Sequence, residues 1–146
     1  MNIFSTEFLG RLHPLLVHLP IAALMLAALV ELWMLIKETP AAPAVVHFLS
    51  AVGAAGAMIA AGTGWLFAHE QHRQDTAALL DQHRWLGLAT ATLAIISWLA
   101  VRAWPDATSP RKRWMRRIAV WGAAVVLVLA SHFGAMLVWG SDYFTS

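Results

Sequence analysis

The chain has 146 residues, of which 60% are hydrophobic and only 12% are charged. A water-soluble domain carries about 25% charged residues, so this composition excludes an ordinary soluble domain. Cysteine is absent, which excludes disulfides, Cys-ligated zinc, iron–sulfur clusters and covalently attached c-type haem.

Four apolar runs follow one another along the chain. They cover residues 14–36, 44–68, 85–104 and 118–140, and each is long enough to cross the hydrocarbon core of a bilayer as an α-helix. Short connections place successive helices antiparallel. We therefore expect a single all-α transmembrane domain over residues 1–146, an up-down-up-down four-helix bundle in the lipid bilayer. No internal repeat is evident, and the first run is expected to be an uncleaved anchor.

The basic residues indicate how the bundle lies in the membrane. Six of the ten Lys and Arg lie in or beside the connection between the third and fourth runs: Arg102, Arg111, Lys112, Arg113, Arg116 and Arg117. Lys37 lies on the same side, and the opposite side has only Arg11, Arg73 and Arg84. The excess of basic residues on cytoplasmic loops places both termini outside the cytoplasm, which is the periplasm for a bacterial inner membrane. Such a cluster beside spanning helices is a topology signal that meets anionic lipid, so no nucleic acid is expected as a partner.

One carboxylate is also expected within the membrane. Glu31 lies in the inner third of the first run, and an acidic residue at that depth needs a partner. We expect it to pair with an arginine of the basic cluster or to lie near Lys37, with a role in a proton path as the alternative.

Histidines at membrane depth are the candidate ligands for a metal or haem. His132 lies well inside the fourth run, and His18 lies about one turn inside the first. Neutral imidazole binds transition metals and takes the axial positions of haem iron. We expect His18 and His132 to be the metal ligands, with His83 as the alternative. Similar depth favours the pair His18–His132, whereas the diagonal position of the first and third helices favours His18–His83.

A haem with two axial histidines also needs cations or hydrogen-bond donors for its propionates. Arg11, Arg84 and Trp85 lie at the outer boundary of the spans and can supply them. We therefore expect a b-type haem in the outer half of the bundle. The expected cofactor-binding residues are His18, His132, His83, His13, Arg84, Arg11 and Trp85.

These expectations lead to one main function and two alternatives. The main hypothesis is an electron-transfer protein or subunit that connects the quinone pool with a periplasmic cytochrome, without catalytic residues of its own. The first alternative is a cofactor-free anchor or assembly subunit of a larger respiratory or transport complex. The second is a copper or zinc site formed by outer histidines, namely His13, His69, His72 and His83. No hydrolase motif is present, and an oligomer is compatible with the sequence.

Four segments resemble the DUF2231 family of predicted four-helix bacterial membrane proteins. They are His13–Pro20, Thr63–Trp65, His83–Gly87 and Ser131–Tyr143. Where relatives often have a second glycine and a further histidine, this chain has Ala135 and Trp139, which removes any function that needs an imidazole at the latter position. Some relatives occur beside, or fused to, c-type cytochrome domains. The resemblance therefore implies membrane electron transfer and a redox role for His18, His83 and His132.

Overall fold

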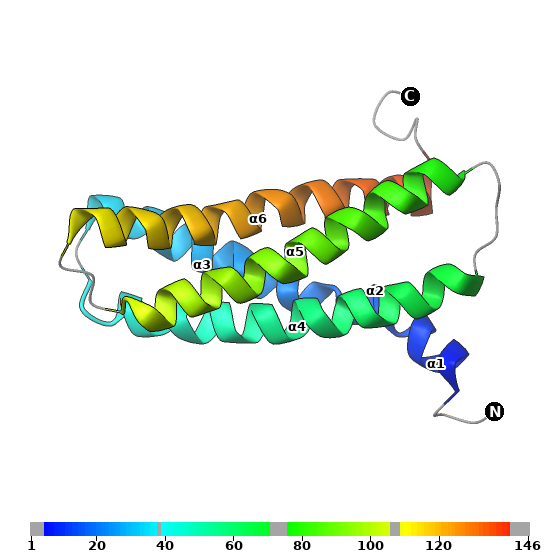
Figure 1. Ribbon diagram of the computed structural model, residues 1–146, viewed down its shortest axis with the longest axis horizontal. Coiled ribbons are helices and arrows are strands. Elements are labelled where there is room, and N and C mark those ends of the chain that lie inside the picture. The colour runs from blue at the N-terminus through cyan, green and yellow to red at the C-terminus, as the bar shows by residue number, and fades with distance from the viewer. Residues whose placement is uncertain (1–4, 38, 71–75, 106–108, 141–146) are drawn as a thin grey trace.

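The computed structural model describes residues 5–37, 39–70, 76–105 and 109–140, and these residues form helices and no strands. The helices are α1 (Thr6–Arg11), α2 (His13–Leu16), α3 (His18–Ile36), α4 (Ala42–Glu70), α5 (Ala77–Ala103) and α6 (Pro110–Trp139). The four long helices run antiparallel to their neighbours in sequence (Figure 1). The all-α four-helix architecture is therefore confirmed.

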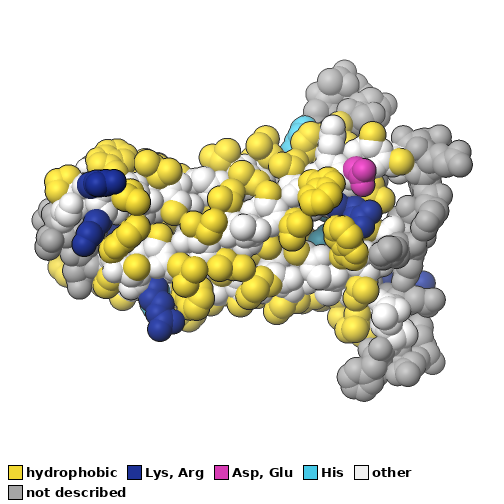
Figure 2. Space-filling view, in the orientation of Figure 1, with side chains coloured by type: hydrophobic (Ala, Val, Ile, Leu, Met, Phe, Trp, Pro, Cys, Tyr) yellow, Lys and Arg dark blue, Asp and Glu magenta, His cyan; other side chains and the backbone are white. Residues whose placement is uncertain are grey.

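Four stretches of the described residues are long and apolar enough to cross a membrane. They are Phe8–Trp33, Ala42–Ala68, Ala77–Ala103 and Pro110–Trp139. The helices α5 and α6 begin eight residues ahead of the apolar runs, because the segments 77–84 and 110–117 are helical although they contain charged and polar residues. Large hydrophobic side chains cover the middle of the bundle, and charged side chains gather toward its ends (Figure 2). Lipid can solvate the large apolar side chains on this surface. The core is therefore filled by small residues, such as Ala27, Ala94 and Ala123, which let the helices pack closely.

The first span consists of three helical pieces that bend toward α4. The Ser5 hydroxyl accepts a hydrogen bond from the Phe8 amide and caps α1. Pro14 stands in the first turn of α2, where its missing N–H costs nothing. Pro20 stands in the first turn of α3 and likewise cannot extend a hydrogen-bond ladder from the preceding segment. These prolines account for the interruption between α1 and α3.

The arrangement of the helices places the first and third spans diagonally. The helix α3 packs against α4 and α6, and α5 packs against the same two helices. The short helices α1 and α2 pack against α4. They lie at the same end of the bundle as the last turn of α6 and the first turn of α5 (Figure 1).

The two halves of the bundle, a first hairpin formed by α1–α4 and a second hairpin formed by α5–α6, repeat one pattern of buried positions. Buried positions recur at a constant separation of 70 residues, as in the pairs Ala27/Ser97, Glu31/Val101, Val46/Arg116, Ala54/Ala124, Ala57/Leu127 and Ala60/Ala130. The expectation of no internal repeat is wrong. Few of these pairs are identical residues, so the repeat is visible in which positions are buried rather than in the letters.

One end of the bundle, which we call the arginine end, is closed by Glu31, Arg116 and Arg117. Glu31 is fully buried, and its Oε1 lies 2.8 Å from Nε of Arg116 while its Oε2 lies 3.3 Å from Nε of Arg117. Arg116 also donates to the carbonyls of Trp104 and Pro105 at the end of α5. Arg117 donates to the carbonyl of Met34 near the end of α3. Glu31 thus pairs with arginines of the basic cluster, as expected, and the two arginines satisfy carbonyls that helix ends leave without partners.

Candidate functional site

At the opposite end of the bundle, His13 and His83 lie with their rings in contact. The ring centroids are 6.1 Å apart, and the ring planes meet at 74°. His13 is the first residue of α2, and His83 lies in the second turn of α5. The two diagonal spans therefore meet through these imidazoles. We call this the histidine end.

Each histidine binds a backbone carbonyl of a neighbouring helix through Nδ1. The Nδ1 atom of His13 lies 2.9 Å from the Ala60 oxygen of α4, and that of His83 lies 2.9 Å from the Ala130 oxygen of α6. A carbonyl oxygen only accepts hydrogen bonds, so Nδ1 carries the hydrogen in both rings. In the neutral rings the Nε2 atoms then keep their lone pairs, which is the state that binds metal ions.

Two glycines make these contacts sterically feasible. A methyl group on Gly64 would lie 2.7 Å from Cε1 of His13, and one on Gly134 would lie 2.9 Å from Cε1 of His83. Each glycine stands one helical turn after the carbonyl that its histidine binds. Because glycine has no Cβ, the imidazole can lie directly on the helix backbone. It can then reach a carbonyl oxygen that already accepts a hydrogen bond within the helix.

The two halves of this site are equivalent positions of the two hairpins. His83 follows His13 by 70 residues, and the same separation relates Ala130 to Ala60 and Gly134 to Gly64. This is the separation that relates the buried core positions. The histidine pair therefore belongs to the repeat itself and joins its two copies.

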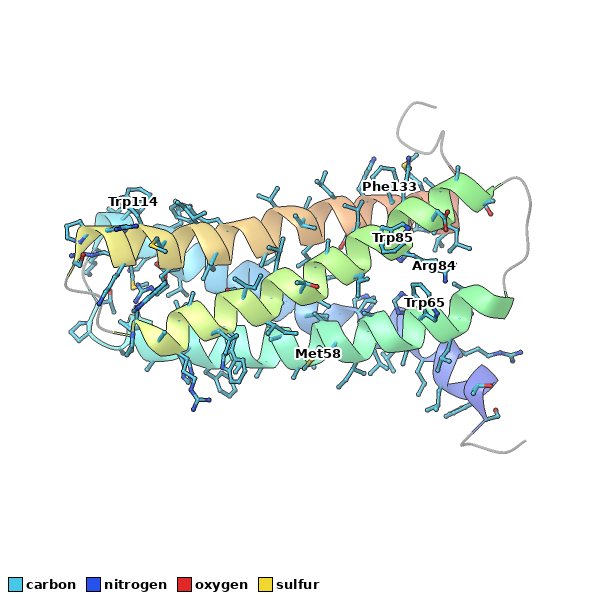
Figure 3. The ribbon with its side chains drawn as sticks, in the orientation of Figure 1. Met58, Trp65, Arg84, Trp85, Trp114 and Phe133 are labelled. Atoms are coloured by element: carbon cyan, nitrogen blue, oxygen red, sulfur yellow. The ribbon has the colours of Figure 1, made fainter. Side chains whose placement is uncertain are left out.

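The residue that follows His83 in the sequence, Arg84, is an arginine on the same helix. The Arg84 guanidinium lies 4.0 Å from the centre of the Trp65 ring, and one of its nitrogens lies 3.9 Å from the Asp81 carboxylate. Its Nε is buried without a hydrogen-bond partner. Figure 3 shows Arg84 between Trp65 of α4 and Trp85 of α5. The cation thus stacks on Trp65, on the residue that follows His83, and its Nε is still available as a donor.

The structure places the other predicted site residues on the surface. His18 is exposed, with its Nδ1 3.3 Å from the Leu15 carbonyl, and His132 is exposed, with its ring 5.9 Å from that of Phe133. Arg11 is exposed in α1 and Trp85 is 63% exposed in α5. No measured contact tests the prediction that His18 and His132 bind haem, and it stays a prediction.

The predicted copper or zinc site falls partly outside the described residues. The side chain of His69 and all of His72 lie there, and so does Arg73. Within the described part of the chain, no three histidine or acidic side chains lie close enough to hold a metal ion together. The described residues therefore offer two histidines in contact, His13 and His83, as metal donors.

Depth in the apolar runs does not identify the pairing of His13 with His83. His13 and His18 are five residues apart, which corresponds to about 140° around a helix, so they cannot face the same neighbour. The spacing that identifies the pair is the 70-residue separation shared by the two histidines and their glycines.

The fold and the paired imidazoles define a four-span membrane protein with a built polar site at one end of an apolar bundle. Residues 11–145 match the family described as predicted membrane protein DUF2231, and the chain belongs to that family. No curated protein and no solved structure matches the chain.

Proposed function

We propose that the protein is a membrane electron-transfer protein, or a subunit of one, that holds a b-type haem between His13 and His83. It would pass electrons between the quinone pool and a periplasmic cytochrome. The observation that carries this proposal is the imidazole pair, in which each Nδ1 is committed to a backbone carbonyl.

The separation of the rings would suit two imidazoles that hold one metal ion. Two imidazoles bound through bonds of about 2 Å to one metal ion have their ring centres about 6 Å apart. The centroids of His13 and His83 are 6.1 Å apart. A hydrogen bond from Nδ1 to a backbone carbonyl is also the usual support of a metal-bound histidine, since it fixes the tautomer and the ring orientation.

The neighbouring residues fit the remaining needs of a haem. Propionates need a cation at the membrane surface, and Arg84 lies next to His83 with a buried Nε that lacks a partner. Arg11 is exposed at the same end of the bundle, and Trp85 lies on the lipid-facing side of α5. The same end also lacks the dense basic cluster, which supports a periplasmic location for the histidine end in a bacterial inner membrane.

The residues of the chain have distinct roles in this proposal. When bound, haem supplies a one-electron carrier, and ligation by two histidines suits electron transfer rather than oxygen binding. His13 and His83 would hold the iron through Nε2 and keep their protons at Nδ1. The carbonyls of Ala60 and Ala130 orient the rings and increase the basicity of Nε2.

A reduced-minus-oxidised absorption spectrum of the purified protein, expressed with adequate haem supply, tests the proposal. The wild type is expected to show a b-type haem. His13→Ala and His83→Ala are each expected to lose it, whereas His18→Ala and His132→Ala serve as matched controls that keep it. Loss in the two control variants with retention in the first two would instead identify His18 and His132 as the ligands.

The alternative of a cofactor-free anchor or assembly subunit has one observation in its favour. The contacts of His13 with Ala60 and of His83 with Ala130 also join neighbouring helices, so they can stabilise the bundle without any bound group. Absence of a haem spectrum in the wild type, together with lower thermal stability of both His13→Ala and His83→Ala, would support this role over electron transfer.

A further inference from the structure

A groove between α5 and α6 lies beside the histidine pair. It has a volume of about 550 Å³ and is lined by Asp81, Gln82, Trp85, Leu86, Ala89 and Phe133. Figure 3 shows Trp85 of α5 and Phe133 of α6 near each other at this end of the bundle. Within a membrane the groove opens toward lipid, because Trp85 is 63% exposed.

The lining changes from polar to apolar along α5. Asp81 and Gln82 stand in the turn nearest the end of the bundle, and Trp85, Leu86 and Ala89 follow deeper in the span. A site with two aromatic side chains and a few polar groups at one edge binds a flat ring with polar substituents. Its open apolar side leaves room for a hydrocarbon tail in the bilayer.

The groove and the histidine pair share the same stretches of α5 and α6. Gln82 directly precedes His83, and Leu86 stands one turn after it on the same helix. On α6, Phe133 directly precedes Gly134, whose backbone carries the His83 ring. A molecule in the groove would therefore contact the residues that flank His83 on α5 and Gly134 on α6.

The repeat shows which lining residues are particular to this site. The positions 70 residues before Asp81 and Ala89 are Arg11 and Leu19. The first hairpin thus has a base in place of the acid and a larger side chain in place of the alanine. The acceptor at the rim and the space deeper in the groove belong to the second hairpin only.

We propose that this groove binds the ring of a quinone or quinol. The Gln82 amide would donate to a ring oxygen, the Asp81 carboxylate would accept from a hydroxyl of the quinol form, and the ring would lie against Trp85 and Phe133. The role of this site as the point where electrons enter or leave rests on the proposed function, whereas quinone binding itself does not need a bound haem.

Binding of a short-chain benzoquinone to the haem-free protein in lipid nanodiscs, followed by quenching of tryptophan fluorescence, tests the assignment. Ala89→Leu fills the groove and Gln82→Leu removes a hydrogen-bonding group, so each is expected to weaken binding about tenfold or more. Thermal melting confirms that both variants are folded. The matched control is Val128→Phe in the apolar groove between α3 and α6, which is expected to leave binding unchanged.

The outcomes separate this inference from the haem proposal. Unchanged binding in both groove variants, an equal loss in Val128→Phe, or displacement of the quinone by an alkane of similar length would overturn the quinone site. A haem spectrum without quinone binding refutes the groove alone. Quinone binding with the expected variant effects, in a protein that never takes up haem, supports the groove and refutes the haem.

Discussion

At the scale of single residues, the histidine pair depends on two glycines and two carbonyls. A helix carbonyl normally accepts one hydrogen bond from the amide four residues later, and it keeps a second lone pair. The Ala60 and Ala130 oxygens use that lone pair for the imidazoles. Side chains on the following turn would cover these oxygens, and Gly64 and Gly134 leave them accessible.

Gly64→Ala is expected to destabilise the protein. The added methyl would lie 2.7 Å from Cε1 of His13, so the ring must move off the Ala60 carbonyl. The partly buried Nδ1–H of His13 then loses its acceptor, which costs about 1–3 kcal/mol. The midpoint of thermal unfolding in detergent measures this change.

Gly62→Ala is the matched control, because no atom lies within 4 Å of the position of its added methyl. Since alanine favours the helix over glycine by about 1 kcal/mol, this variant should be as stable as the wild type or more stable. Equal destabilisation by both substitutions would mean that α4 needs flexible backbone here and that the His13 contact contributes little.

The preference for His18 over His13 in the sequence-based prediction is also explained at this scale. His18 lies deeper in the apolar run than His13, and depth alone made it the favoured ligand. The structure separates the two histidines by the break between α2 and α3, and it turns His13 toward the bundle. Which face of a broken helix points inward depends on backbone geometry around Val17, which hydropathy does not encode.

At the scale of helices, the repeat is broken at the arginine end. The pair Glu31–Arg116 in α3 and α6 corresponds, 70 residues away, to Val101 and Val46 in α5 and α4. The same place in the two hairpins thus holds an ion pair on one side and two apolar side chains on the other. Buried ion pairs and well-packed apolar pairs can have similar net stability, whereas a single buried charge is costly.

A double-mutant cycle with Glu31→Val and Arg116→Val tests this equivalence. Glu31→Val should destabilise the protein by about 3–5 kcal/mol, because it leaves Arg116 and Arg117 buried without their carboxylate. Arg116→Val should cost less, because Glu31 keeps its contact with Arg117. The double variant should be less destabilised than the sum of the two, with a coupling energy of about 1–3 kcal/mol. Denaturation of the four proteins in the same detergent gives the values.

Additive effects in that cycle would contradict the pairing of Glu31 with Arg116. Val46→Ala serves as a control for the loss of packing at the equivalent position, since Val46 is fully buried without an ion pair. The destabilisation of a double variant with Val46→Ala and Glu31→Val should be close to the sum of the two single effects, because the two residues share no polar contact.

At the scale of the whole molecule, hydropathy predicted the fold and could not predict the site. The number of spans follows from the length and composition of each segment, so four helices were predictable without tertiary information. The pairing of Glu31 with inner arginines was predictable as well, because a carboxylate within a membrane needs a partner. The contact between His13 and His83 was not predictable from hydropathy, since it depends on how the two diagonal spans are rotated relative to each other.

The orientation of the bundle is the property of the whole molecule that the proposed function needs most. The arginine end holds Arg116, Arg117 and the exposed residues Arg111 and Lys112, and it is expected to face the cytoplasm. The histidine end would then face the periplasm, where a soluble cytochrome can approach it.

The absence of cysteine allows this orientation to be tested by labelling without background. We expect a membrane-impermeant maleimide added to intact bacterial cells to label Ala77→Cys, which is exposed at the start of α5. Lys112→Cys, exposed in the first turn of α6, should be labelled only after the inner membrane is permeabilised. The reverse pattern would place the histidine pair on the cytoplasmic side. A periplasmic cytochrome could not then be its partner, even if the haem and the quinone site were both present.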